Sequence, residues 1–186
     1  HSDHTTGVVR LLNLMNVNTV ILPDNAEDTN GDDVLDDIIA ACEDNGTKIV
    51  YITRDTEFTA GAIRLSVYES SERGSRDESG IMSTVSIGDY DMLVTGDVEK
   101  VVERELVSSH DLSGTELLIV PHHGSKYSTS DELLSELRPE TAVISTGYNR
   151  YGHPTKETLD KLNEYGVNVL RTDELGRIVL HVASGD

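Results

Sequence analysis

Apolar and polar residues recur along the chain with two periods, which together predict a mixed α/β protein. Apolar positions three and four residues apart predict amphipathic helices, and short β-branched runs bounded by turn residues predict strands. The predicted helices lie at 8–14, 33–44, 98–108, 131–137 and 156–165. The predicted strands lie at 18–22, 48–53, 57–61, 62–68, 81–87, 92–95, 116–120, 141–145, 167–171 and 177–182. Because no linker, repeat or low-complexity tract interrupts this order, we expect residues 1–186 to form one layered α/β domain.

The predicted strand at 116–120 leads into Pro-His-His-Gly-Ser at 121–125, where two adjacent histidines leave the end of a buried strand. A strand end is a rigid support, and functional residues concentrate on the loops that leave it. Three other polar stretches supply histidines and carboxylates: 1–4 (His-Ser-Asp-His), 95–97 (Thr-Gly-Asp) and 152–154 (Gly-His-Pro). Five of the seven histidines fall within these four stretches. Nitrogen and carboxylate ligands together favour zinc, manganese or iron over calcium.

Two of these candidates have a structural alternative when each is considered alone. Asp97 precedes a predicted helix, and the local pattern favours a role as the cap of that helix. His153 is a single histidine in a loop before a proline, a position that a structural or solvated side chain can also occupy. A metal site therefore follows from the combination of the stretches rather than from any one of them.

The net charge and composition of the chain disfavour one class of partner and exclude several structural features. The formal net charge of −19 repels nucleic-acid phosphates unless metal ions or a local basic cluster compensate for it. The only cysteine, Cys42, excludes an internal disulfide, and its apolar neighbours predict a buried small hydrophobic residue. No apolar run is long enough for a membrane span, and no signal-peptide pattern opens the sequence.

The polar stretches resemble the motifs of the metallo-β-lactamase fold. Residues 1–4 look like the second half of its His-x-His-x-Asp-His motif. Three further stretches are similar to the C-terminal hydrolase domain of the ComEC family of competence proteins and its stand-alone relatives. They are Leu-Val-Thr-Gly-Asp at 93–97, Val-Pro-His-His-Gly-Ser-Lys-Tyr-Ser at 120–128 and Ile-Ser-Thr-Gly-Tyr-Asn-Arg-Tyr-Gly-His-Pro at 144–154. Leu-Arg-Thr-Asp-Glu-Leu-Gly-Arg-Ile at 170–178 adds to the resemblance.

This resemblance implies a four-layer αβ/βα sandwich, whose N-terminal strands we expect to be missing from residues 1–186. It also implies a hydrolase in which one or two divalent ions, zinc or manganese, activate water. By motif position, the metal ligands would be His1, Asp3, His4, Asp97, His122 and His153. The resemblance therefore favours Asp97 as a bridging carboxylate over a helix cap. No histidine lies between His4 and His110, where many members of the fold have a further ligand. The sequence therefore leaves both one and two bound ions as alternatives.

We expect the catalytic residues to be Asp3 and His123, with Ser125 and Lys126 donating to a substrate phosphate or oxyanion. The alternative for these two donors is ordinary capping within the loop. Of the two adjacent histidines, we place His122 nearer the metal and expect the other to orient it.

The resemblance implies a phosphodiesterase or nuclease linked to DNA uptake, with single-stranded DNA or another phosphodiester as partner. Two alternatives are a secreted hydrolase of small esters, lactones or envelope phosphodiesters, and a non-catalytic metal-binding module. The presence of Asp3, His4, Asp97 and His153 favours an enzyme. We expect an extracytoplasmic or cell-surface location if the chain is part of a ComEC-like protein, and a secreted or cytoplasmic location otherwise.

Overall fold

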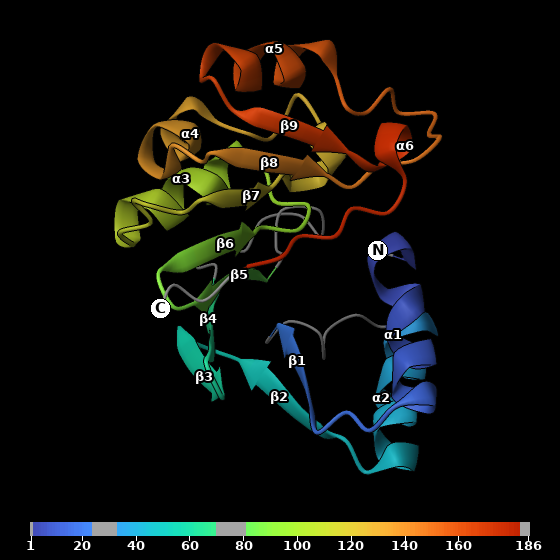
Figure 1. The fold of residues 1–186 in the computed structure, drawn as a ribbon. Helices are drawn as coiled ribbons and strands as arrows, with labels where there is room; N and C mark the ends of the chain where they lie inside the picture. Colours follow the sequence, from blue (N-terminus) through green and yellow to red (C-terminus); the bar gives the residue numbers. More distant parts are fainter. Residues whose placement is uncertain (1, 24–32, 70–80, 183–186) are drawn as a thin grey trace. The chain divides into compact units, whose positions relative to one another are not determined.

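The computed structural model describes residues 2–23, 33–69 and 81–182 (Figure 1). For residues 2–4, 6, 33 and 34, only the backbone is described. Within these ranges, none of the helices is long and apolar enough to cross a membrane. The chain divides into two compact units, residues 1–54 and 55–186, and each is described by itself. The expectation of a single domain stays a prediction.

The first unit joins a helical pair to a two-stranded parallel sheet. Its elements are α1 (Ser2–Leu14), β1 (Thr19–Pro23), α2 (Asp33–Asn45) and β2 (Lys48–Ile52). Thr19 lies opposite Lys48 at the start of the strand pairing. The two helices contribute a small apolar core of Leu12, Ile38, Ala41 and Cys42. Cys42 is fully buried there, which confirms its prediction as a small hydrophobic residue.

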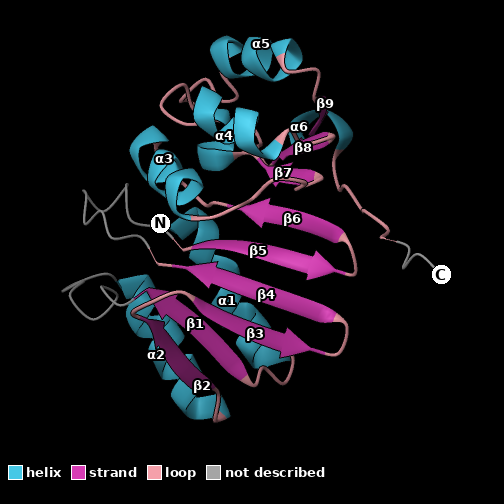
Figure 2. Ribbon diagram, turned by 90° about the vertical axis from the view of Figure 1, so that its left-hand side faces the viewer, coloured by secondary structure: helices cyan, strands magenta, loops and turns pink. Residues whose placement is uncertain are grey.

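The second unit contains a seven-stranded sheet in which the strands follow one another in chain order (Figures 1 and 2). The strands are β3 (Thr56–Ala60), β4 (Ile63–Tyr68), β5 (Met82–Ile87), β6 (Tyr90–Val94), β7 (Leu117–Ile119), β8 (Thr141–Ile144) and β9 (Asn168–Arg171). From β3 to β6 the pairs are antiparallel, and from β6 to β9 they are parallel. The parallel half requires crossover connections, and the three long helices of this unit provide them.

These helices are α3 (Lys100–Ser109), α4 (Asp131–Leu137) and α5 (Lys156–Glu164), and they follow β6, β7 and β8 respectively. Consecutive right-handed crossovers place them on the same face of the sheet, as Figure 2 shows. The inward residues of these helices form one core with residues of the strands. The helices contribute Val102, Leu106, Leu133, Leu134, Leu137 and Leu162, and the strands contribute Leu93, Leu118, Ala142 and Ile144. This packed core holds the ends of β6, β7 and β8 in place, and the candidate site lies on the loops that leave those ends.

The predicted helices are all present, as are the predicted strands except the last. Helix α1 begins earlier than expected, at Ser2. The predicted strand at 177–182 is wrong, because this segment is neither helix nor strand. A short helix, α6 (Thr172–Leu175), follows β9 instead, and Arg171 forms ion pairs with Asp173 and Glu174 at its start. Strand propensity needs a pairing partner, and within the described ranges no strand pairs with 177–182.

A buried carboxylate joins α3 to the segment that precedes α4. Glu103 is completely buried, and its two carboxylate oxygens accept hydrogen bonds from the backbone N–H groups of Thr129 and Ser130, both at 2.6 Å. Burial raises the pKa of Glu103, although the hydrogen bonds from Ser130 and Thr129 oppose this shift. Because Thr129 has a positive φ of 58°, an unusual conformation for a β-branched residue, this anchor also stabilises a strained turn.

We predict that Glu103→Gln lowers the free energy of unfolding by about 2 kcal/mol, because one side-chain oxygen becomes an N–H donor that faces a backbone N–H. Urea denaturation followed by circular dichroism measures the change. Glu164→Gln, at the exposed end of α5, is the matched control and should stay within about 0.5 kcal/mol of the parent chain. Equal stability of the two variants would show that the Glu103 anchor contributes nothing specific.

Candidate metal centre

Three loops bring the candidate residues together at one edge of the seven-stranded sheet. Val94, Ile119 and Val143 are register partners across β6, β7 and β8, so these parallel strands end at nearly the same level. Asp97 follows β6, the histidine pair follows β7, and His153 lies on the loop after β8. Their carboxyl ends lie at the same edge of the sheet because the strands are parallel. The adjacent loops can therefore present their side chains to a common site.

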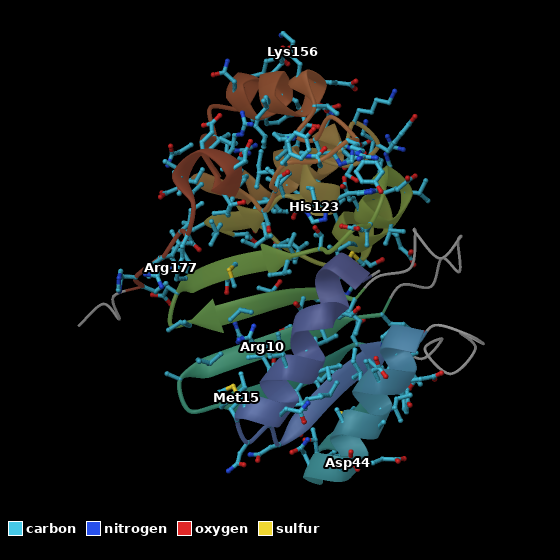
Figure 3. The ribbon with its side chains drawn as sticks, turned by 90° about the vertical axis from the view of Figure 1, so that its right-hand side faces the viewer. Arg10, Met15, Asp44, His123, Lys156 and Arg177 are labelled. Carbon is cyan, nitrogen blue, oxygen red and sulfur yellow. The ribbon has the colours of Figure 1, made fainter. Side chains whose placement is uncertain are left out.

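The histidine pair sits in a tight turn, Pro121–Gly124, with an unusual backbone (Figure 3 labels His123). His122 and His123 both have positive φ values, 49° and 53°. Such left-handed conformations cost about 1 kcal/mol each in residues other than glycine, and they cluster at functional sites. The His122 N–H donates to the carbonyl of Gly96 at 2.9 Å, and the Ser125 N–H donates to the carbonyl of His122 at 2.9 Å. The first bond ties the turn to the loop that carries Asp97, and the second closes the turn itself.

His123 faces Asp97, and its ring orientation is set from the opposite side. Its Nδ1 lies 2.6 Å from the carbonyl oxygen of Ser145, which can only accept, so Nδ1 carries the proton. In the neutral ring, Nε2 then presents a lone pair toward Asp97, and it lies 3.6 Å from Oδ1 of that carboxylate. Two ligand atoms on a tetrahedral zinc ion lie about 3.4 Å apart. The 3.6 Å separation of the Asp97–His123 pair is close to this value, so it is compatible with two ligands of one divalent cation.

His122 and His153 form a second pair beside the first. Their ring centroids are 5.6 Å apart and the rings meet edge to face. Burial lowers the pKa of His153, and the neighbouring His122 and His123 lower it further, while Asp97 opposes the shift. The Nδ1 atom of His122 is buried without a hydrogen-bond partner among the described residues. A neutral imidazole is the form that binds a metal, so the lowered pKa of His153 favours a ligand role.

The loop that carries His153 is held together by Asn149, a residue that the sequence analysis missed. The Asn149 amide donates to the carbonyls of Gly147 and His153 at 2.9 and 2.6 Å. Its carbonyl oxygen accepts from the backbone N–H groups of Tyr151 and His153 at 3.1 and 3.0 Å. Asparagine commonly stabilises turns through such hydrogen bonds between its side chain and the nearby backbone. Its position between two glycines was the sequence signal that could have predicted this role.

The loops after β7 and β8 touch at Gly124. A Cβ atom on this glycine would lie 2.6 Å from Cβ of Pro154, which is closer than van der Waals contact allows. Gly124 also has a φ of 83°, and its carbonyl accepts the Thr155 N–H at 2.9 Å. The missing side chain therefore allows the histidine turn and the His153 loop to pack directly on each other.

The other predicted site residues are placed as follows. His1 lies outside the described residues; Asp3 and His4 lie on α1, in the first unit, and only their backbone is described. Ser125 is buried and its Oγ accepts the Tyr127 N–H at 3.3 Å, which favours the loop-capping alternative. Lys126 is exposed on the same loop.

The helix-cap interpretation of Asp97 is wrong, because α3 begins at Lys100 and its cap residue, Glu99, makes no side-chain capping bond. Among the side chains that the structure describes, no three histidine, cysteine, aspartate or glutamate groups form a metal-binding cluster. The described centre consists of two neighbouring pairs, Asp97–His123 and His122–His153.

We predict that Gly124→Ala destabilises the chain more than Gly114→Ala does. Both glycines have nearly the same φ, 83° and 84°, but a Cβ at Gly114 meets nothing within 4 Å. The strain of a positive φ is therefore common to both variants, and the clash with Pro154 is specific to Gly124. Urea denaturation should show an additional loss of about 1–3 kcal/mol for Gly124→Ala. Equal losses of stability in the two variants would show that the histidine turn and the His153 loop can move apart without lowering the free energy of unfolding.

No protein-family model matches the chain. It is 33% identical over 144 residues to ComE operon protein 3 of Bacillus subtilis, an alignment that covers 76% of this chain and 19% of that protein. It is 34% identical over 119 residues to competence protein ComA of Neisseria gonorrhoeae, covering 62% of this chain and 17% of the relative. The chain thus spans about a fifth of the length of these curated relatives.

A solved structure supports the fold. The metallo-β-lactamase fold protein YhfI from Bacillus subtilis matches with a TM-score of 0.54, covering 93% of this chain and 71% of that chain. Its sequence identity is 13%, so this likeness concerns the fold alone. The mixed α/β fold class is confirmed. Over most of its length the chain is therefore homologous to the competence proteins of the ComEC and ComA type, and its fold resembles that of a metallo-β-lactamase fold protein.

Proposed function

We propose that this chain is a metal-dependent hydrolase that cleaves phosphodiesters. The observation that carries the proposal is the Asp97–His123 pair, with its 3.6 Å separation and the His123 ring held by the Ser145 carbonyl. A ligand histidine whose second nitrogen donates to a carbonyl is typical of metal sites in proteins. We place His123 at the metal in preference to His122, because its Nε2 faces the Asp97 carboxylate.

The remaining ligands would come from His153 and from the first motif. His153, whose pKa is lowered, offers a neutral imidazole near neutral pH. His1, Asp3 and His4 belong to the proposed ligand set by motif position only. Zinc or manganese, as one ion or two, suits this mixture of nitrogen and carboxylate ligands. When bound, such an ion supplies a water of lowered pKa and neutralises charge that develops on a phosphoryl oxygen.

The chain's own residues would orient the reacting groups. Asp97 and His123 present their lone pairs in a fixed direction, because the histidine turn is bonded to Gly96 and Ser145. Lys126 extends from the same loop into solvent, where an ammonium group can pair with a substrate phosphate. Ser125 is assigned to loop capping, because its hydroxyl is buried and already accepts a backbone N–H.

Nucleic acid is the phosphodiester that the relatives favour, because one of them, ComA of Neisseria gonorrhoeae, is named a competence protein. The net charge of −19 opposes binding of a polyanion at long range. Cations near the centre would offset this locally, and Lys126 and Lys100 lie together, with the Lys100 ammonium 2.7 Å from the Lys126 carbonyl. An extracytoplasmic or cell-surface location belongs to the same proposal.

We predict that Asp97→Ala lowers the metal-dependent hydrolysis of bis-p-nitrophenyl phosphate by more than about 100-fold, because a first ligand is lost. Metal content, measured after dialysis against zinc or manganese, should fall in parallel. The unfolding transition should stay close to that of the parent chain. Asp89→Ala is the matched control, because Asp89 is an exposed carboxylate in the turn before β6, at the opposite end of that strand.

An active Asp97→Ala protein with a full complement of metal would contradict the site assignment. Metal binding by the parent chain, combined with hydrolysis of esters or lactones but not of phosphodiesters, would favour the small-substrate hydrolase. Metal binding by the parent chain without turnover of phosphodiesters, esters or lactones would favour the non-catalytic metal-binding module.

A further inference from the structure

The loop between β8 and α5 exposes two aromatic side chains and a cation beside the metal centre. Tyr148 is fully exposed, Tyr151 is 83% exposed, and Arg150 is exposed between them. A fully solvated tyrosine ring leaves a large apolar area in contact with water, and aromatic rings of this kind are enriched at binding sites. The exposed rings of this loop are therefore a candidate binding surface.

The backbone that carries these side chains is held in place although the side chains are exposed. The Asn149 amide makes hydrogen bonds with backbone groups on both sides of it, from Gly147 to His153. The Tyr151 ring stacks against the His153 ring, with centroids 5.9 Å apart and an angle of 29° between the planes. One end of the exposed aromatic surface therefore adjoins the candidate metal centre.

The neighbouring loop repeats the combination of an aromatic ring and a cation. Tyr127 is exposed, and the Lys126 ammonium lies 5.0 Å from the centroid of its ring. This loop and the His153 loop are in direct contact, through the Thr155–Gly124 hydrogen bond. Three of the exposed tyrosines of the described residues thus lie on the two loops that also carry the candidate histidine ligands.

We propose that Tyr148 and Tyr151 form a stacking surface for the unpaired bases of a single-stranded nucleic acid whose backbone enters the candidate metal centre, with Arg150 as a cationic contact to that backbone. This inference rests on the proposed phosphodiester hydrolase function and names the part of the substrate that is recognised. Each unpaired base has two π faces that stack on tyrosine, and Arg150 and Lys126 can pair with flanking phosphates. A duplex hides its base faces, so this surface selects single strands.

The strong negative charge of the chain makes base stacking more important, not less. A net charge of −19 weakens any binding that relies on phosphate contacts alone. Base–aromatic stacking carries no net charge and adds about 1–3 kcal/mol per base in single-strand binding proteins. Stacking can therefore supply affinity that the overall electrostatics of this chain do not.

The test is the affinity of the chain for a fluorescent, phosphorothioate-linked thymidine oligonucleotide of about twelve nucleotides, measured by fluorescence anisotropy. Tyr148→Ala should weaken binding by about ten-fold, whereas Tyr148→Phe, which keeps the ring, should bind as the parent chain does. Tyr165→Ala removes an exposed tyrosine from the opposite end of α5 and is the remote control. Because Tyr148 is fully exposed, its truncation should leave the unfolding transition unchanged.

An abasic oligonucleotide of equal length and charge separates stacking from phosphate contacts. It should bind more weakly than the thymidine strand to the parent chain, and Tyr148→Ala should remove most of that difference. Binding of a duplex, whose base faces are hidden, should not change when Tyr148 is replaced by alanine. Arg150→Ala should weaken both strands alike and reduce the slope of log affinity against log salt by about 0.7. A uridine strand in parallel shows whether RNA as well as DNA provides the bases.

Equal affinities of the parent chain for the thymidine and abasic strands, or no effect of Tyr148→Ala, would overturn the stacking surface. Hydrolysis of bis-p-nitrophenyl phosphate by the same protein would show that the hydrolase proposal stands in that case. Conversely, base-dependent binding without any turnover would retain the stacking surface and contradict the hydrolase.

Discussion

The parallel pairing of β6, β7 and β8 is the constraint on which the candidate centre depends. Val94, Ile119 and Val143 lie side by side in this register, so three loops far apart in the sequence begin at the same edge. A shift of β7 by one residue would turn its side chains to the other face and move both histidines away from Asp97. The core formed by α3, α4 and α5 resists such a shift, because Leu118, Ala142 and Ile144 are fully buried against these helices.

The histidine turn concentrates backbone strain at the point where the chemistry is proposed. Its two left-handed residues are each unfavourable, and they persist because the surrounding hydrogen bonds and the Gly124–Pro154 contact leave the turn little freedom. The same loop is anchored further along by the buried carboxylate of Glu103. Stability and site geometry therefore depend on the same few contacts, so the structural variants also probe the site.

The chain as a whole is strongly acidic, whereas the candidate centre and its neighbouring loops carry side chains of both charges. Asp97 and the histidines form a compact group whose mutual influence includes the lowered pKa of His153. Lys126 and Arg150 extend from the two adjoining loops together with exposed tyrosines. The two cations attract a substrate phosphate at short range, whereas the net charge of the whole chain repels it at long range. Because salt screens charges according to their separation, ionic strength changes the balance between the two effects.

The order of helices and strands and the four stretches of histidine and aspartate were readable from the sequence, because periodicity and residue type are local properties. The four-layer arrangement stays a prediction, since the two units are described separately. Only the tertiary structure decided that 177–182 is not a strand, because a strand needs a neighbour to pair with. It also decided that Asp97 does not cap α3 and that His123, not His122, faces Asp97. Adjacent histidines look alike in a sequence, and contacts with other loops, such as the bond from His123 to the Ser145 carbonyl, distinguish them.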